Sequence, residues 1–138
     1  MTQINAYLGF DGKCREAMTF YQECLGGELT LQTMAESPLA DQMPAEDGQN
    51  ILHSTLTQGD LVLMATDMGR GERINGNTVS LALNCSSEEE INRFFSNLSV
   101  GGQISCPLSE QFWGGTFGSF TDKYGMNWML NYEKKSGK

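Results

Sequence analysis

The sequence predicts an α+β protein in which two βαβββ modules form a curved mixed sheet around a cavity, with the helices outside. Two segments carry apolar stripes at helical spacing, and a pair of glycines follows each of them. Around each helix the same order recurs: an apolar strand-like stretch, the helix, another strand, and a hairpin containing glycine. Because 138 residues suffice for one buried core, we expect a single domain, with module one at about residues 1–70 and module two at about 75–138.

The first module is expected to begin with a strand in INAYLGF and to continue with a helix at about residues 12–25. The apolar stripe of that helix consists of Ala17, Phe20, Tyr21 and Cys24. After Gly26 and Gly27, ELTLQTM is typical of a strand, and NILHSTLTQGDLVLMAT of a hairpin that turns near Gly59. The acidic loop AESPLADQMPAEDGQN lies between them and makes this module the longer one.

The second module repeats this order from the strand-like NTVSLAL onward. Ser87 is expected to cap the next helix, with Glu90 completing a capping box. The apolar stripe of that helix consists of Ile91, Phe94, Phe95 and Leu98. A strand in QISCPL and a closing hairpin that turns near Gly125 complete the module.

Composition excludes several functions. The net charge of −8 argues against a nucleic-acid partner, which would need clustered lysine and arginine. No apolar run is long enough for a membrane helix, and no leader peptide is apparent, so we expect a cytoplasmic protein with no membrane partner. The four cysteines form no CxxC pair and the chain has one histidine, so reduced, partly buried thiols are favoured over a zinc site.

Three stretches, YLGFDGKCREAMTFYQECLGGEL, HSTLTQGDLVLMATDM and FWGGTFGSFTDKYGMNWML, carry a family resemblance. The chain resembles the vicinal oxygen chelate superfamily of glyoxalases, bleomycin-resistance proteins and dioxygenases, and within it the PhnB-like subgroup. That subgroup is often labelled as 3-demethylubiquinone methyltransferase homologues. The sequence does not support that activity, since no glycine-rich loop joins a strand to a helix as an adenosyl site would require. The resemblance implies a cavity for a small organic molecule and a homodimer.

Catalytic members of the superfamily hold a divalent metal through His, Glu or Gln on the first and last strand of each module. The corresponding positions in this chain fall near Asn5, Leu63, Val79 and Met129. None of the four is a histidine or a carboxylate, and hard divalent ions need several nitrogen or oxygen ligands. We therefore predict no metal at the inherited position and no cofactor.

His53 is the remaining candidate ligand or acid–base residue, and it matches a histidine common in the PhnB-like subgroup. A two-residue turn at Gln58 and Gly59 would pair His53 with Met64, and Ser54 with Leu63. His53 would then point to the face opposite the inherited metal position, whereas a turn one residue longer would reverse this. A lone histidine in an apolar strand is more often hydrogen-bonded structure than a ligand, although an acid–base role stays open.

The remaining ligand-binding candidates are side chains that could stack on or pack against a flat ligand: Tyr7, Phe112, Trp113 and Met129. Phe112 and Trp113 are favoured because they precede a glycine pair in a connecting segment, whereas Trp128, which could also stack, is less favoured. Asp67 and Asp122 are interpreted as solvated turn carboxylates.

The preferred function is metal-independent binding of a small organic molecule, of the glyoxalase/bleomycin-resistance type. One alternative is a lyase, transferase or dioxygenase-type enzyme that uses a displaced metal near His53. Another is a dimeric interaction module with no small ligand.

Overall fold

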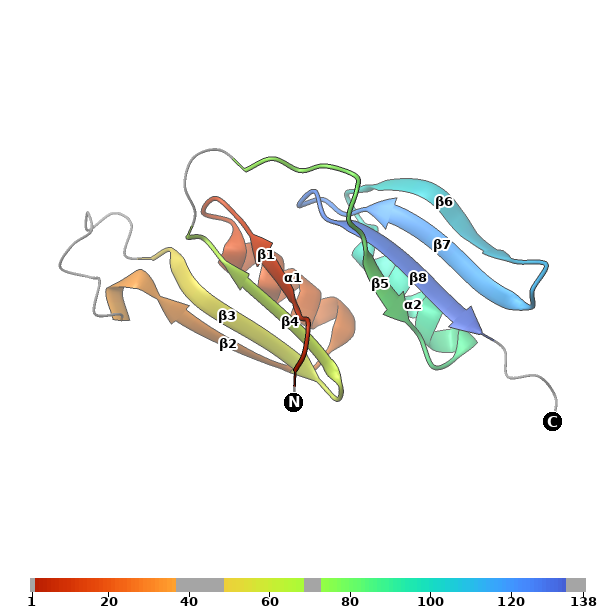
Figure 1. Cartoon of the computed structure of the whole chain (residues 1–138), viewed down its shortest axis with the longest axis horizontal. Helices are drawn as coiled ribbons and strands as arrows, with labels where there is room; N and C mark the ends of the chain where they lie inside the picture. The colour runs from red at the N-terminus through yellow and green to blue at the C-terminus, as the bar shows by residue number, and fades with distance from the viewer. Residues whose placement is uncertain (1, 37–48, 69–72, 134–138) are drawn as a thin grey trace. The chain divides into compact units, whose positions relative to one another are not determined.

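The computed structural model describes residues 2–36, 49–68 and 73–133, so most of the acidic loop of module one lies outside the described residues. The chain divides into two compact units, Met1–Ile74 and Asn75–Lys138. In each unit a strand is followed by a helix and then by three strands, which confirms the predicted βαβββ order (Figure 1). No helix in the described part of the chain is long and apolar enough to cross a bilayer.

The first unit is a sheet of four strands with one helix. Its elements are β1 Ala6–Gly9, α1 Cys14–Leu25, β2 Glu28–Thr33, the 3-10 turn Met34–Glu36, β3 Ile51–Gln58 and β4 Leu61–Thr66. The strands lie in the order β1-β4-β3-β2, where β1 runs parallel to β4 and the other pairs are antiparallel. The carboxyl ends of β1 and β4 therefore lie side by side.

The second unit repeats this topology. Its elements are β5 Leu81–Asn84, α2 Glu88–Leu98, β6 Gln103–Glu110, β7 Gly115–Thr121 and β8 Asn127–Glu133. The strand order is β5-β8-β7-β6, again with one parallel pair, β5 with β8. The predicted cap of α2 is present, since the Ser87 hydroxyl accepts a hydrogen bond of 3.0 Å from the Glu90 amide. The Glu90 carboxylate accepts from the amide of Ser86 instead of closing the box on Ser87.

Helix α1 covers one face of the first sheet and leaves the other free of it (Figure 1). Its buried stripe includes Cys14, Ala17 and Tyr21, and the Cys14 Sγ lies 3.4 Å from the hydroxyl of Ser54 on β3. Ser54 therefore faces the helix, and alternation along the strands places the neighbouring residues on the opposite face. We call this second face the distal face. It consists of Tyr7, Gly9, His53, Thr55, Met64 and Thr66.

The turn of the first hairpin differs from the prediction. The turn residues are Gly59 and Asp60, so Ser54 lies opposite Ala65 and the predicted pairing with Leu63 is wrong. The observed register differs from the predicted one by two residues. Because side chains alternate between the two faces with a period of two residues, His53 still lies on the face away from Leu63. The second hairpin has the longer loop 122–126 between β7 and β8.

The interpretation of Asp67 and Asp122 as solvated turn carboxylates is wrong. Asp122 is 3% exposed and accepts hydrogen bonds from the Tyr124 and Met126 amides and from the indole N–H of Trp128, at 2.8, 3.0 and 2.8 Å. The bond from the indole N–H also fixes Trp128 in the core, where Trp128 is 3% exposed. Asp67 is half-buried and accepts a hydrogen bond from the amide of Cys14 at the start of α1.

Candidate functional site

An aromatic and polar cluster occupies the distal face of the first sheet. The rings of Tyr7 on β1 and His53 on β3 meet edge to face, with centroids 5.9 Å apart and planes at 86°. On the same strand, the Thr55 hydroxyl lies 3.3 Å from Nε2 of His53. Tyr7 is 56% exposed and His53 is half-buried, so both rings are accessible from outside the unit. The structure therefore brings together two of the predicted ligand-binding residues.

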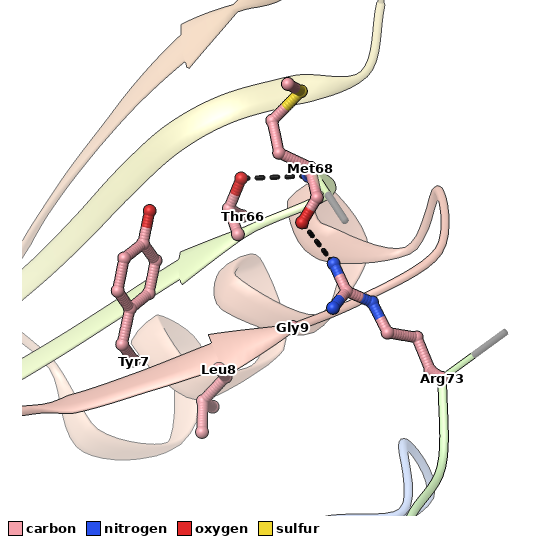
Figure 2. Close-up of a pocket in the computed structure, with 6 residues that line it drawn as sticks. All are labelled: Tyr7, Leu8, Gly9, Thr66, Met68 and Arg73. Atoms are coloured by element: carbon pink, nitrogen blue, oxygen red, sulfur yellow. Dashed lines mark hydrogen bonds between the residues drawn. The ribbon is translucent and has the colours of Figure 1, made fainter. Parts of the chain in front are cut away.

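A hollow of about 370 Å³ lies beside Tyr7, at the adjoining carboxyl ends of β1 and β4. Its walls are formed by Tyr7, Leu8, Gly9, Thr66, Met68 and Arg73. Figure 2 shows the Tyr7 ring and the Thr66 hydroxyl on one side of β1, with the Leu8 side chain directed to the other. The hollow thus continues the accessible surface of the distal face.

The position of Arg73 is fixed by carbonyl groups of the chain. Its Nε donates a hydrogen bond of 3.3 Å to the carbonyl of Phe10, and its Nη2 donates to the carbonyl of Met68 (Figure 2). The guanidinium lies directly on the backbone of Gly9, since a Cβ at that position would be 2.7 Å from Nη1. The end of β1 therefore holds a cationic group at the rim of the hollow.

Thr66 supplies a wall without offering a free hydroxyl. Its Oγ1 donates to the carbonyl of Leu52 at 2.7 Å and accepts from the amide of Met68 at 2.9 Å. The second bond turns the chain after β4 back over the sheet and places Met68 at the hollow. The sequence does not identify Thr66 and Met68 as parts of a site, because their roles depend on this local turn.

The other predicted ligand-binding residues belong to the second unit. Phe112 is fully exposed, and Trp113 is 44% exposed, with its indole lying against Gly115 at the start of β7. Met129 is 38% exposed and lies between Trp128 and Leu130, which are buried beside α2. These three residues are therefore all accessible from outside the second unit.

The four positions predicted to correspond to the metal ligands of the superfamily differ in exposure and in their place on the strands. Asn5 and Val79 precede their strands and are exposed, whereas Leu63 is 5% exposed on the face of β4 that packs toward α1. By strand register the counterpart of Met129 is Met64, because each lies opposite the second residue of its parallel partner strand. Among residues 2–36, 49–68 and 73–133, no three His, Cys, Asp or Glu side chains gather in a metal-binding arrangement.

The cysteines are free thiols, as expected, and three of the four are buried. Burial raises the pKa of Cys14 to about 11 and that of Cys85 to about 12. Such thiols stay protonated at neutral pH and are poor nucleophiles. The structure therefore gives no support for a cysteine-based reaction at these two positions.

The paired βαβββ units define the class of protein: a glyoxalase/bleomycin-resistance-like fold. A glyoxalase-related enzyme from Fulvimarina pelagi shares this fold with a TM-score of 0.60 at 18% identity, covering 96% of this chain and 89% of its own. A glyoxalase/bleomycin resistance protein/dioxygenase from Nocardioides does so with a TM-score of 0.56 at 18% identity, covering 100% and 88%. These likenesses confirm the predicted fold class.

Within that class, the family model described as 3-demethylubiquinone-9 3-methyltransferase matches residues 2–131, and the chain belongs to this family. Protein YjdN of Escherichia coli K12 is 31% identical, with 96% of each chain covered. Protein PA1353 of Pseudomonas aeruginosa is 37% identical with a TM-score of 0.86, covering 98% of this chain and 100% of its own. A PhnB protein from Bacillus cereus is 27% identical with a TM-score of 0.74, covering 95% and 99%. The predicted PhnB-like relationship is confirmed.

Proposed function

We propose that this chain is a small-molecule-binding protein of the glyoxalase/bleomycin-resistance type that binds its ligand without the metal of its catalytic relatives. The observation that carries the proposal is the contact between Tyr7 and His53 beside the hollow on the distal face. An accessible aromatic edge, an imidazole and a concave surface are the components of sites for small organic ligands.

The size of the hollow supports this function. Ligand pockets in proteins are about 300–1,000 Å³, and the hollow of about 370 Å³ lies within that range. Its lining combines apolar surface from Tyr7 and Met68 with one cationic side chain, Arg73. Such a lining suits a small organic molecule better than an extended polymer.

The chemistry of the inherited metal positions supports a metal-independent mode. An aliphatic side chain at Leu63 and Val79 offers no ligand, and a thioether at Met129 is a poor ligand for hard divalent ions. His53 has one ring nitrogen beside the Thr55 hydroxyl, which positions the imidazole as a hydrogen-bonding group for a ligand. On this proposal Tyr7 stacks on the ligand while His53 hydrogen-bonds to it.

We also propose that the protein acts as a homodimer and works inside the cytoplasm. In the first sheet β1 and β2 are edge strands, and in the second β5 and β6 are. Edge strands with unpaired backbone groups favour pairing or covering by another surface. Sedimentation at micromolar concentration should therefore show a dimer, and a monomer would contradict this part of the proposal.

The test is ligand-dependent thermal stabilisation across a broad panel of metabolites, followed by variants. Tyr7→Ala and His53→Ala should reduce the stabilisation given by any hit, whereas Arg15→Ala, on the exposed surface of α1, should not. Elemental analysis of the purified protein, run beside the thermal measurements, determines its metal content. One tightly held transition metal per chain, lost in His53→Ala, would replace this proposal with a metal-dependent enzyme. No hit from the panel would favour an interaction module.

A further inference from the structure

We infer that the hollow beside Tyr7 binds the carboxylate of a monoanionic organic acid through Arg73, with an apolar or aromatic body lying along Tyr7 and Met68. This inference rests on the proposed function and names the ligand class for that same site. It is carried by the geometry of Arg73, the acidity of the rest of the chain and the shape of the lining.

Arg73 retains hydrogen-bonding capacity at the hollow. Its contacts to the carbonyls of Phe10 and Met68 use Nε and one Nη2 hydrogen, and Nη1 has no hydrogen-bond partner among the described residues. Figure 2 shows this nitrogen directed toward Gly9, on the hollow side of β1. A guanidinium cannot be deprotonated in a protein, so the group remains cationic and keeps donors that fit a carboxylate.

The charge of Arg73 is not neutralised within the described structure. No carboxylate of the described residues lies within ion-pair distance of it, although the chain carries a net charge of −8. A cation held against two carbonyls and left without an acidic partner creates a local site for an anion in an otherwise repulsive field. The structure thus provides electrostatic selection at one point of the surface.

The surroundings of Arg73 favour a single negative charge over a phosphate. No second basic side chain among the described residues lines the hollow, and the Thr66 hydroxyl already has its donor and acceptor bonds. A dianion would therefore have one charge compensated and the other exposed to the acidic chain. A carboxylate matches the single cation that the described lining provides.

The body of the ligand is constrained by Tyr7 and Met68. Tyr7 is 56% exposed and Met68 is 37% exposed, so both present apolar surface at the hollow that Arg73 lines. An aromatic or branched aliphatic acid would cover this surface while its carboxylate reached Arg73. His53 is in edge contact with Tyr7 and is not among the residues that line the hollow.

Gly9 provides an independent way to move the cation. A Cβ at this position would be 2.7 Å from Nη1 and 2.8 Å from Cζ of Arg73, which are atoms at the end of a flexible side chain. Gly9→Ala is therefore expected to fold and to displace the guanidinium from the hollow. The variant keeps the arginine and its charge, and changes only its position.

The experiment is a titration of the 15N-labelled full chain with benzoate at pH 8, followed by amide shifts of Gly9 and its neighbours. Benzamide and phenylphosphonate are titrated in parallel as the neutral and dianionic counterparts. The variants are Arg73→Gln, Arg73→Lys, Gly9→Ala, Tyr7→Ala and, as the matched control, Arg15→Gln. Thermal unfolding of each variant verifies that it is folded.

We expect benzoate to bind at least tenfold more tightly than benzamide or phenylphosphonate. Arg73→Gln and Gly9→Ala should weaken benzoate binding at least tenfold, Arg73→Lys should weaken it less, and Arg15→Gln should leave it unchanged. Equal binding of benzoate and benzamide, with both dependent on Tyr7, would overturn the inference while the proposed function stands. Tighter binding of phenylphosphonate, benzoate binding that is indifferent to Arg73, or no benzoate shift around Gly9 would also overturn it.

Discussion

Asp67 connects three elements of the first unit, and its replacement gives a quantitative test of the fold. Oδ1 accepts a hydrogen bond of 2.9 Å from the amide of Cys14, the first residue of α1. Oδ2 accepts one of 2.8 Å from the amide of Ile51, whose carbonyl accepts from the Asp67 amide at 2.8 Å. Lys13 makes no side-chain cap at the start of the helix, so Asp67 supplies it from the end of β4.

Asp67→Ala is expected to lower the free energy of unfolding by about 3 kcal/mol. Hydrogen bonds to charged groups contribute roughly 1.5–3 kcal/mol each, and the partial burial of both bonds favours the low end of that range. The negative charge also lies at the N-terminus of α1, where the helix dipole favours it. Asp67→Asn keeps one acceptor oxygen, so we expect it to lose about half as much.

The assay is urea unfolding followed by circular dichroism, with Asp11→Ala as the matched control. Asp11 precedes the same helix, but it is exposed and makes no hydrogen bond to the helix among those described, so its removal should cost less than about 0.5 kcal/mol. An Asp67→Ala variant within about 1 kcal/mol of the wild type would refute the capping role. Equal losses for Asp11→Ala and Asp67→Ala would refute it as well.

Four other outcomes follow from buried groups. Asp122→Ala should destabilise the second unit by about 2–4 kcal/mol in urea unfolding, because the indole N–H of buried Trp128 loses its acceptor; a change below about 1 kcal/mol would contradict this. At pH 8 roughly one in a thousand Cys14 thiols is ionised, so mass spectrometry should find Cys14 and Cys85 unmodified by iodoacetamide in the folded protein. Folding raises the pKa of both thiols, so the two protonated thiols contribute to the stability of the folded state below pH 9. This contribution is lost as the pH rises toward 11 and 12, and the melting temperature should therefore fall over that interval. Gly118→Ala should lower stability by about 1–3 kcal/mol, since its Cβ would lie 2.6 Å from the Phe95 ring, and an unchanged melting temperature would show that α2 relaxes freely.

The helices and strand order could be predicted because their signals are local and periodic. Ile91, Phe94, Phe95 and Leu98 are all buried, as their spacing indicates. The hairpin turns could not be predicted as closely, although a glycine lies in each of them. Gly59 is the first residue of a two-residue turn, whereas Gly125 is near the end of the loop 122–126. Aligning the modules on these glycines therefore matched Met129 with Leu63, while the register matches it with Met64.

The candidate site could be predicted only in part, since its components come from distant segments. The sequence indicates Tyr7 as an aromatic that could stack on a ligand and His53 as the only histidine, and the chain brings them together across β4. Arg73 has no motif of its own and reaches the hollow because Met68 and Phe10 present carbonyls to it. Asp67 was misinterpreted because its partner amide belongs to a residue 53 positions earlier in the chain.

The adjacency of Thr66 and Asp67 links the two faces of the first sheet. The Thr66 side chain lies on the distal face and lines the hollow, while the next residue holds the first amide of α1 on the other side. Local opening that frees this end of β4 would unwind the first helical turn and remove a wall of the hollow in one event. Amide hydrogen exchange at Cys14 is therefore a remote reporter of whether the hollow is intact, and its slowing would measure how tightly a ligand holds this end of the strand.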